Sequence, residues 1–254
     1  MPAPPPPPGQ ASAWPRRLRT WHRRVAVVVG LQLLAWTVSG LMFTWDPIEQ
    51  VRGETALVER RVPDMPEPAR LVSLDAAWRA AGAPTSSSAA LEWQRERWCW
   101  VLHADSRSPR LVDARSGERL AELTAAEARR MADARLAAPA AVGQIEHIAA
   151  AAGEYRGKTV PAWRVAYDDP EHTAVYVDAW TGEVTAVRTD TWRRFDWFWM
   201  LHIMDYDART DFHHPLLTGA ALLGVATSLS GLLLAAFVLR PRRLRGAGRM
   251  RPPA

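Results

Sequence analysis

The chain has 254 residues, of which 48% are hydrophobic and 23% charged, and its sequence pI is about 10.1. The basic balance comes from the two ends: five Arg lie in residues 1–24 and six in residues 240–254, and neither segment contains Asp or Glu. Residues 25–239 carry all 27 acidic residues and a net charge of −6. We therefore expect no nucleic-acid partner, because the body is acidic and the basic clusters directly flank apolar stretches, as they do in membrane proteins. A single cysteine, Cys99, excludes an internal disulfide and covalent haem attachment.

The first 45 residues read as a tail followed by a membrane span. Residues 1–24 begin with a proline run and end in arginines, which predicts a disordered, basic cytoplasmic tail. Residues 25–45 contain no charged side chain over a length that crosses a bilayer, so they predict a first transmembrane helix. A cleaved signal peptide is the alternative, but the apolar run is long for one and no A-x-A-like cleavage site follows it.

A second apolar run covers residues 216–239 and predicts the second transmembrane helix. The basic tail 240–254 follows at once, and basic residues that flank spans are retained in the cytoplasm. Both termini are then cytoplasmic, and residues between the spans lie outside the bacterial inner membrane, in the periplasm. The lipid bilayer is thus the first expected partner.

An internal repeat lies between the spans. Residues 98–120, WCWVLHADSRSPRLVDARSGERL, match residues 163–185, WRVAYDDPEHTAVYVDAWTGEVT, at an offset of 65 residues without a gap. The shared core is V-D-A-x-[ST]-G-E. Two copies of one pattern predict two similar structural units in tandem.

Each copy predicts a helix followed by antiparallel strands. Apolar residues alternate along 163–167 and 175–179, which is typical of strands with one buried face, and a helical stretch precedes each hairpin, over 73–82 and 124–136. Asp113 and Asp178 occupy the same turn of the two copies, so we interpret them as turn-fixing and not catalytic residues. The predicted fold is therefore an α+β domain with repeats over 46–122 and 123–190.

The segment VYVDAWTGEV at 175–184 resembles the PepSY domain. The whole layout resembles the PepSY-associated transmembrane family, which includes iron-regulated membrane proteins and larger siderophore-iron reductases. The resemblance is carried by WHRRVAVVVGLQLLAWTVSG at 21–40, PAWRVAYDDPEHTAVYVDAWTGEV at 161–184, and WMLHIMDYDAR at 199–209 ahead of SLSGLLL. It implies two tandem PepSY-like repeats carried by two transmembrane helices, with a role in an envelope iron or redox system.

Larger relatives have four spans and are thought to hold b-type haem through membrane histidines. Two of those positions match His22 and His202, so the resemblance implies that these residues are candidate haem ligands. His202 lies in the amphipathic, interfacial segment predicted over 191–215, where it shares a helical face with three aromatic residues. The alternative reading is that both histidines are ordinary residues of the membrane interface.

The predicted topology restricts that haem hypothesis. His22 and His202 lie at opposite membrane faces, about 30 Å apart, so one chain cannot place both on one iron. Haem b would require a dimer or a partner subunit. Small residues permit close helix contact, and the second span contains four of them, which favours self-association there: Gly219, Gly224, Ser228 and Gly231.

A metal site is a weaker hypothesis for the segment before the second span. His213, His214 and Asp211 form a short cluster of metal-ligating residue types. Adjacent residues of a helix point about 100° apart, so the two histidines are not a chelating pair by spacing alone. A solvated turn is the alternative.

No nucleophile elbow, P-loop, zincin helix or dinucleotide-binding fingerprint occurs in the sequence, so we name no catalytic residues and favour a non-enzymatic role over an enzyme. The leading hypothesis is a membrane-anchored periplasmic PepSY module that binds a partner or ligand in an envelope iron or redox system. The first alternative is a transmembrane electron-transfer protein with haem b. The second alternative is a regulator of envelope peptidases.

Overall fold

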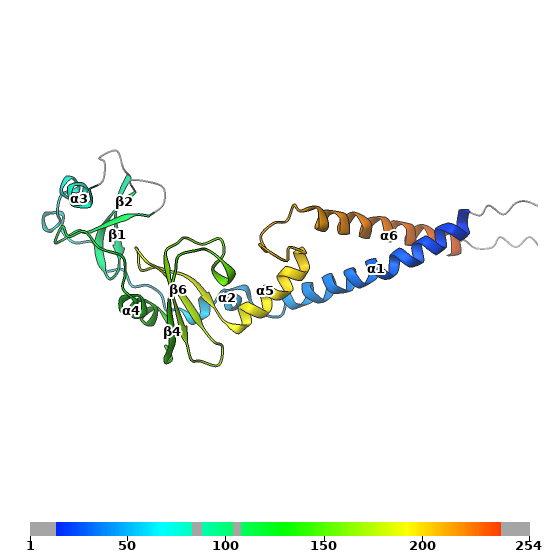
Figure 1. The fold of residues 1–254 in the computed structure, drawn as a ribbon, viewed down its shortest axis with the longest axis horizontal. Coiled ribbons are helices and arrows are strands. Elements are labelled where there is room, and N and C mark those ends of the chain that lie inside the picture. Colours follow the sequence, from blue (N-terminus) through cyan, green and yellow to red (C-terminus); the bar gives the residue numbers. More distant parts are fainter. Residues whose placement is uncertain (1–13, 83–87, 104–107, 240–254) are drawn as a thin grey trace, which may run out of the picture. The chain divides into compact units, whose positions relative to one another are not determined.

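The computed structural model describes residues 14–82, 88–103 and 108–239, and it shows an α+β protein with two antiparallel sheets (Figure 1). The predicted disordered tails lie outside the described residues, except for residues 14–24, which are helical. The chain divides into two compact units. One consists of Met1–Leu41 with Trp199–Ala254, and the other of Met42–Phe198.

Two long apolar helices, α1 (Trp14–Phe43) and α6 (Pro215–Leu239), form the first unit with the end of α5 (Asp190–Ile203). Segments Arg19–Phe43 and Pro215–Ala236 are long and apolar enough to cross a membrane, and only 11% and 6% of their apolar windows are buried. A core helix of a soluble protein would be mostly buried. The two helices therefore suggest membrane association, and both predicted apolar runs are confirmed as helical.

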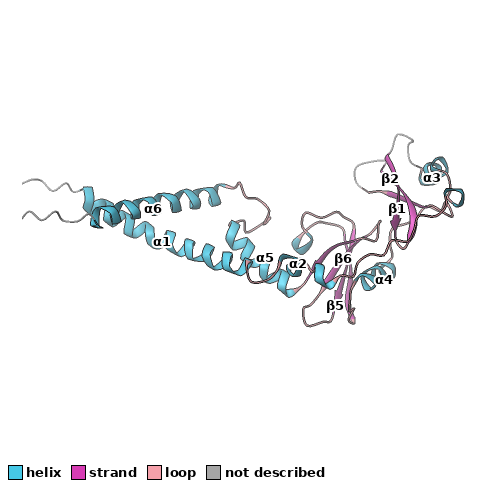
Figure 2. Ribbon diagram, turned by 180° about the vertical axis from the view of Figure 1, so that it is seen from behind, coloured by secondary structure: helices cyan, strands magenta, loops and turns pink. Residues whose placement is uncertain are grey.

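Helices α1 and α6 lie side by side, as Figures 1 and 2 show from opposite directions. Glycines of α6 face α1: a Cβ added at Gly224 would lie 4.0 Å from Leu33, and one at Gly231 would lie 3.5 Å from His22. Two of the four small residues predicted for self-association therefore line the contact within the chain. Gly219, by contrast, has open space around it.

The first repeat consists of α3 (Leu74–Ala81) and a sheet of β1 (Ser88–Gln94), β2 (Arg97–His103) and β3 (Arg110–Asp113). The hydroxyl of Ser73 caps α3, and the sheet order is β1-β2-β3. Small and apolar residues of α3 and the sheet form a common core: Ala77, Ala81, Leu102 and Val112.

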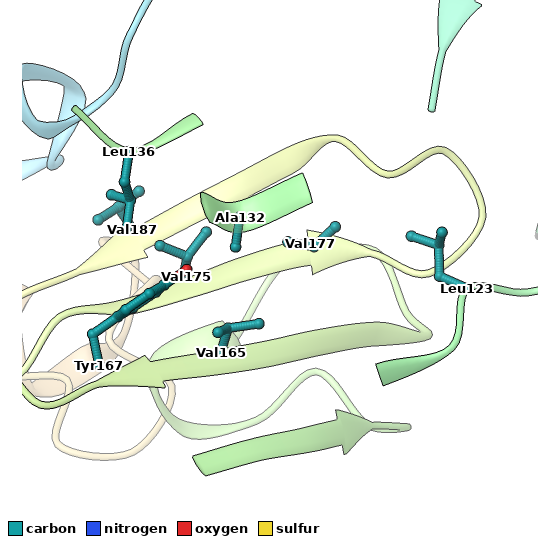
Figure 3. Packing of buried hydrophobic residues seen from close by; sticks show 8 residues of the cluster. All are labelled: Leu123, Ala132, Leu136, Val165, Tyr167, Val175, Val177 and Val187. Carbon is teal, nitrogen blue, oxygen red and sulfur yellow. The ribbon is translucent and has the colours of Figure 1, made fainter. Parts of the chain in front are cut away.

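The second repeat has the same order of elements with one more strand. Helix α4 (Ala125–Arg135) precedes β4 (Val142–Ile148), β5 (Ala162–Tyr167), β6 (Ala174–Asp178) and β7 (Val184–Arg188), which pair in that order. Figure 3 shows Ala132 of α4 lying over valines of β5 and β6. Thr124 and Glu127 form a capping box at the start of α4, with both reciprocal hydrogen bonds present.

The predicted role of the repeated aspartates is also confirmed. Asp113 Oδ1 accepts from the N–H groups of Arg115 and Ser116 at 2.8 and 3.1 Å, and Asp178 Oδ1 accepts from those of Trp180 and Thr181 at 2.9 and 2.8 Å. Each turn ends on a glycine with a positive φ, 75° at Gly117 and 73° at Gly182, as the pattern requires. The two copies therefore build the same turn with the same side-chain contacts.

Short elements complete the second unit: α2 (Ile48–Val51) and the 3-10 turns η1 (Glu54–Ala56), η2 (Pro68–Arg70) and η3 (Gly153–Tyr155). Turn η3 covers the second face of the β4–β7 sheet. There the Tyr155 ring stacks on Tyr176 with centroids 4.6 Å apart. The sheet is thus covered on both faces, by α4 and by η3.

Candidate functional site

The unit formed by α1, α6 and the end of α5 contains both histidines that the sequence singles out. His22 lies on α1, and its Nδ1 is 2.7 Å from the hydroxyl of Ser230 on α6. That hydroxyl in turn lies 2.8 Å from the Thr227 carbonyl of its own helix, to which it donates. A hydroxyl has one proton, so this arrangement assigns the shared hydrogen to His22 Nδ1 and leaves Nε2 as the nitrogen with a lone pair.

His202 has an equivalent arrangement near the end of α5. Its Nδ1 is 2.8 Å from the hydroxyl of Ser39, which donates to the Ala35 carbonyl of α1 at 2.8 Å. The His202 carbonyl accepts from the indole N–H of Trp36 at 2.8 Å. Ser39 is fully buried, so α1 orients the His202 ring through Ser39 and holds the His202 backbone through Trp36.

The structure does not bring the two histidines together. His22 and the residue that orients His202, Ser39, are 17 positions apart on α1, which is about 25 Å along the helix axis. The cavity between α1 and α6 has a volume of about 140 Å³ and is lined by Gln32, Trp36, Met204 and Gly224 among others. Pockets for drug-sized ligands measure about 300–1,000 Å³, so this cavity does not fit haem within one chain.

The residues of the metal hypothesis bond the polypeptide itself. Asp211 Oδ1 accepts from the N–H of His213 at 2.7 Å, and His214 Nε2 donates to the Ile203 carbonyl at 2.9 Å. Asp205 caps the same loop, and four backbone N–H groups, those of Asp211 and Thr210 first, lower the pKa of its carboxyl. Among the described residues, no group of three or more His, Cys, Asp or Glu side chains could hold a metal ion. The described contacts of these residues are therefore made within the loop and with neighbouring backbone, and the metal site stays a prediction.

A charged cleft of about 310 Å³ lies where the two repeats meet. Four arginines contribute to its lining together with an aromatic ring and three glutamates: Arg60, Arg61, Arg95, Arg135, Trp93, Glu59, Glu96 and Glu183. Arg60 binds across the junction, pairing with Glu183 of the second repeat at 2.9 Å and donating to the Trp93 carbonyl of the first. Residues of both repeats therefore contribute to this one cleft.

Arg95 shows how closely the repeats fit at the cleft. Its side chain is only 10% exposed and lies 3.1 Å from the position of a Cβ on Gly182, so a larger residue at 182 would displace it. Burial lowers the pKa of Arg95, and the Glu127 carboxylate opposes that effect. The guanidinium also donates to the Ala121 carbonyl at 2.6 Å, which holds it at the base of the cleft.

Ion pairs hold the first half of α5 against the second repeat. Arg193 pairs with Glu154 of η3 at 2.7 Å and with Asp190 at 2.8 Å, while Arg156 pairs with the buried carboxylate of Asp196. Hydrogen bonds from His172 and Arg193 lower the pKa of Asp190. Helix α5 therefore begins as an integral part of the sheet domain and continues to His202.

Sequence reasoning did not identify Ser39, Ser230, Gln32 or Arg60 as site residues. A serine in an apolar helix is common and bonds its own backbone, so nothing in the sequence distinguishes Ser39 and Ser230 from Ser228. Gln32 carried a usable signal, because it is the one amide side chain in a span that otherwise contains no strongly polar residue after Arg24.

Comparisons with known proteins gave no match, whether to a family model, to a curated protein or to a solved structure.

Proposed function

We propose that the protein is a membrane-anchored module in which α1 and α6 cross the bacterial inner membrane and hold a periplasmic domain of two PepSY-like repeats. The domain binds a partner in an envelope iron or redox system and is not itself an enzyme. The observation that carries this proposal is the duplicated unit: two helix-plus-sheet repeats, each closed by the same Asp-fixed turn, stand between two apolar helices. Arginines in the first turns of α1 and in the sequence that follows α6 favour cytoplasmic ends.

The cleft between the repeats is the proposed partner surface. It combines arginines with an exposed rim and one tryptophan, and such residues dominate the energetics of protein interfaces. Because both repeats contribute to it, the cleft also gives a reason for tandem copies: neither repeat forms it alone. The resemblance to PepSY proteins supplies the iron or redox context of the partner.

Membrane topology is tested with reporter fusions after residues 22, 120 and 250. We expect the fusions after 22 and 250 to report cytoplasm and the fusion after 120 to report periplasm. A cytoplasmic report from the central fusion would overturn the anchored-module proposal.

Partner binding is tested by photocrosslinking in intact cells. A photoreactive amino acid replaces Arg61, an exposed residue of the cleft, and in a matched control it replaces Glu49, an exposed residue outside the cleft. We expect a covalent adduct with an envelope iron or redox protein from position 61 only, identified by mass spectrometry. An adduct with a peptidase would instead favour the regulator hypothesis, and equal labelling from both positions would contradict a role for the cleft.

A haem b electron-transfer protein is the second candidate, and one observation favours it. The contact with Ser230 leaves Nε2 of His22 as the lone-pair nitrogen, and Ser39 contacts Nδ1 of His202. Histidines that ligate metals are oriented in this way by a hydrogen bond at the other nitrogen. Since one chain does not accommodate the group, haem requires a second copy or another subunit. The test is an absorption spectrum of detergent-purified protein from haem-replete cells, oxidised and reduced, beside His22→Ala and His202→Ala. A reduced α-band that either variant loses would establish haem binding, and a well-folded protein with no Soret band would exclude it.

A further inference from the structure

Gln32 is the only amide side chain within the apolar segment of α1, and it lies close to the centre of that segment. Counting along Arg19–Phe43, it is roughly 15–20 Å from either end of that segment, which is the middle of a bilayer if the segment spans one. Its side chain is half-buried and lines the cavity between α1 and α6. No described residue of the chain forms a hydrogen bond with its amide.

An unsatisfied amide is unfavourable in hydrocarbon, because no water is present to replace the missing partner. The neighbouring walls of the cavity do not supply one: most are apolar groups such as Val28 and Leu223, and the indole N–H of Trp36 donates to the His202 carbonyl. Thr37, one turn further along, shows the contrast, since its hydroxyl bonds the Leu33 carbonyl of its own helix at 2.8 Å. Gln32 therefore requires a group from another molecule.

We propose that this group is Gln32 of a second copy of the chain, and that the protein forms a homodimer across α1. The proposal rests on the membrane anchoring proposed above. A carboxamide carries both a donor and an acceptor, so two copies related by a two-fold axis satisfy each other's amides with identical contacts. Glutamine side chains drive association between transmembrane helices by this chemistry.

The volume of the cavity between α1 and α6 fits one side chain from a second copy. Its volume of about 140 Å³ is close to that of a protein cavity that accommodates benzene, about 150 Å³, so one side chain fills it and a large cofactor does not. The surface beside it is open for a second helix: Val28, one turn before Gln32 on the same face, and Leu31, its neighbour, are each 66% exposed. The sequence predicted self-association through α6, but Gly224 and Gly231 of α6 already face α1 of the same chain. The proposed dimer surface is therefore on α1.

Energy transfer between labelled copies in lipid vesicles tests the dimer. The full chain with Ala254→Cys is labelled with donor or acceptor and reconstituted into phosphatidylcholine–phosphatidylglycerol vesicles at several protein-to-lipid ratios. We expect the energy-transfer efficiency to vary linearly with the fraction of acceptor-labelled chains, because in a dimer each donor has a single partner. In Gln32→Leu the dissociation constant should rise about tenfold, a change typical of one interhelical amide contact. In Thr37→Val it should not change, because that hydroxyl is satisfied within its own helix.

Flotation of the same vesicles separates the two proposals. Protein that does not float with the lipid would contradict the anchor itself. Protein that floats but shows no transfer at any ratio would overturn the dimer and leave the anchor standing. Equal dissociation constants for the wild type and Gln32→Leu would also overturn it. Gln32→Asn, which keeps the amide, should recover part of the transfer and so distinguishes loss of the contact from misfolding.

Discussion

At the scale of single residues, the repeated aspartate turn is the best-defined feature. The Asp178 carboxylate accepts hydrogen bonds from two backbone N–H groups and from the hydroxyl of Thr181 at 3.0 Å. Asp113 repeats the two backbone contacts in the first copy. A short-range contact of this kind depends only on the neighbouring four residues, which is why the sequence pattern predicts it.

Replacing Asp178 should therefore destabilise the second repeat. We expect Asp178→Ala to lower the free energy of unfolding by about 1–3 kcal/mol, because two backbone N–H groups lose their acceptor. Urea unfolding of the full chain in detergent, followed by near-ultraviolet circular dichroism, measures the change. The matched control is Asp64→Ala, at an exposed position, and equal stabilities of the two variants would refute the turn-fixing role.

Cys99 offers a second test at this scale. Its thiol is buried in β2, and burial first, with the nearby Asp113 carboxylate second, raises the pKa of the thiol to about 11. At pH 8 the thiolate fraction is then about one in a thousand. We expect a maleimide to label Cys99 only after denaturation, while a cysteine introduced by Glu49→Cys is labelled in the native protein. Rapid native labelling of Cys99 would show that β2 is not packed as described.

At the scale of elements, the sequence did not predict strands where its apolar pattern is weakly periodic. The predicted helices and central strands are present, but β1, β4 and β7 were not predicted individually. Strand β1 reads SAALEWQ and β4 reads VGQIEHI, and neither alternates cleanly between apolar and polar residues. Their strand conformation is decided by pairing with β2 and β5, which supplies hydrogen bonds that local sequence does not encode.

Helix α5 should depend on its buried ion pair. In Asp196→Ala the Arg156 guanidinium would lose its carboxylate partner. We expect the free energy of unfolding to fall by about 2–3 kcal/mol and amide exchange to become faster over residues 190–198. Hydrogen exchange with mass spectrometry measures both the site and the extent. The control, Arg79→Ala, breaks a pair whose side chains are 75% and 67% exposed and should change stability by less than about 0.5 kcal/mol. Unchanged exchange in α5 would contradict its attachment to the sheet.

At the scale of the whole molecule, several carboxylates make folding sensitive to acid. The N–H and hydroxyl groups of Thr124 lower the pKa of Glu127, and hydrogen bonds from His172 and Arg193 lower that of Asp190. At Asp113 burial opposes ionisation, but the N–H groups of Ser116 and Arg115 and the Arg97 guanidinium outweigh it and lower the pKa. These groups bind protons more weakly in the folded chain than in the unfolded one.

The sign of the pH dependence follows from that difference. A carboxyl with a lowered pKa stabilises the fold above its unfolded pKa of about 4, and the stabilisation is lost as the pH falls through the folded value. We therefore expect the free energy of unfolding to be level from pH 7 to about 5 and to decrease below about pH 4.5. Urea titrations at pH 7, 5, 4 and 3 measure it, and Glu127→Gln should show a shallower decrease. Greater stability at pH 3 than at pH 7 would contradict the lowered values.

The sequence by itself determined the features that depend on short stretches of chain. Apolar length predicts α1 and α6, the Thr124–Glu127 spacing predicts the capped start of α4, and the V-D-A-x-[ST]-G-E pattern predicts two equal turns. Each of these features depends on contacts within a few residues or on an apolar pattern that can be recognised in a short stretch of sequence.

Only the tertiary structure decided which distant residues meet. It pairs His22 with Ser230, His202 with Ser39 and Arg60 with Glu183, and it turns Gln32 toward a groove that offers its amide no partner. These contacts depend on how far each helix is rotated and which strands are neighbours, and packing of the whole set of side chains fixes both. A single sequence names the side chains but does not show how each helix is rotated about its axis, so only the three-dimensional structure identifies the candidate site.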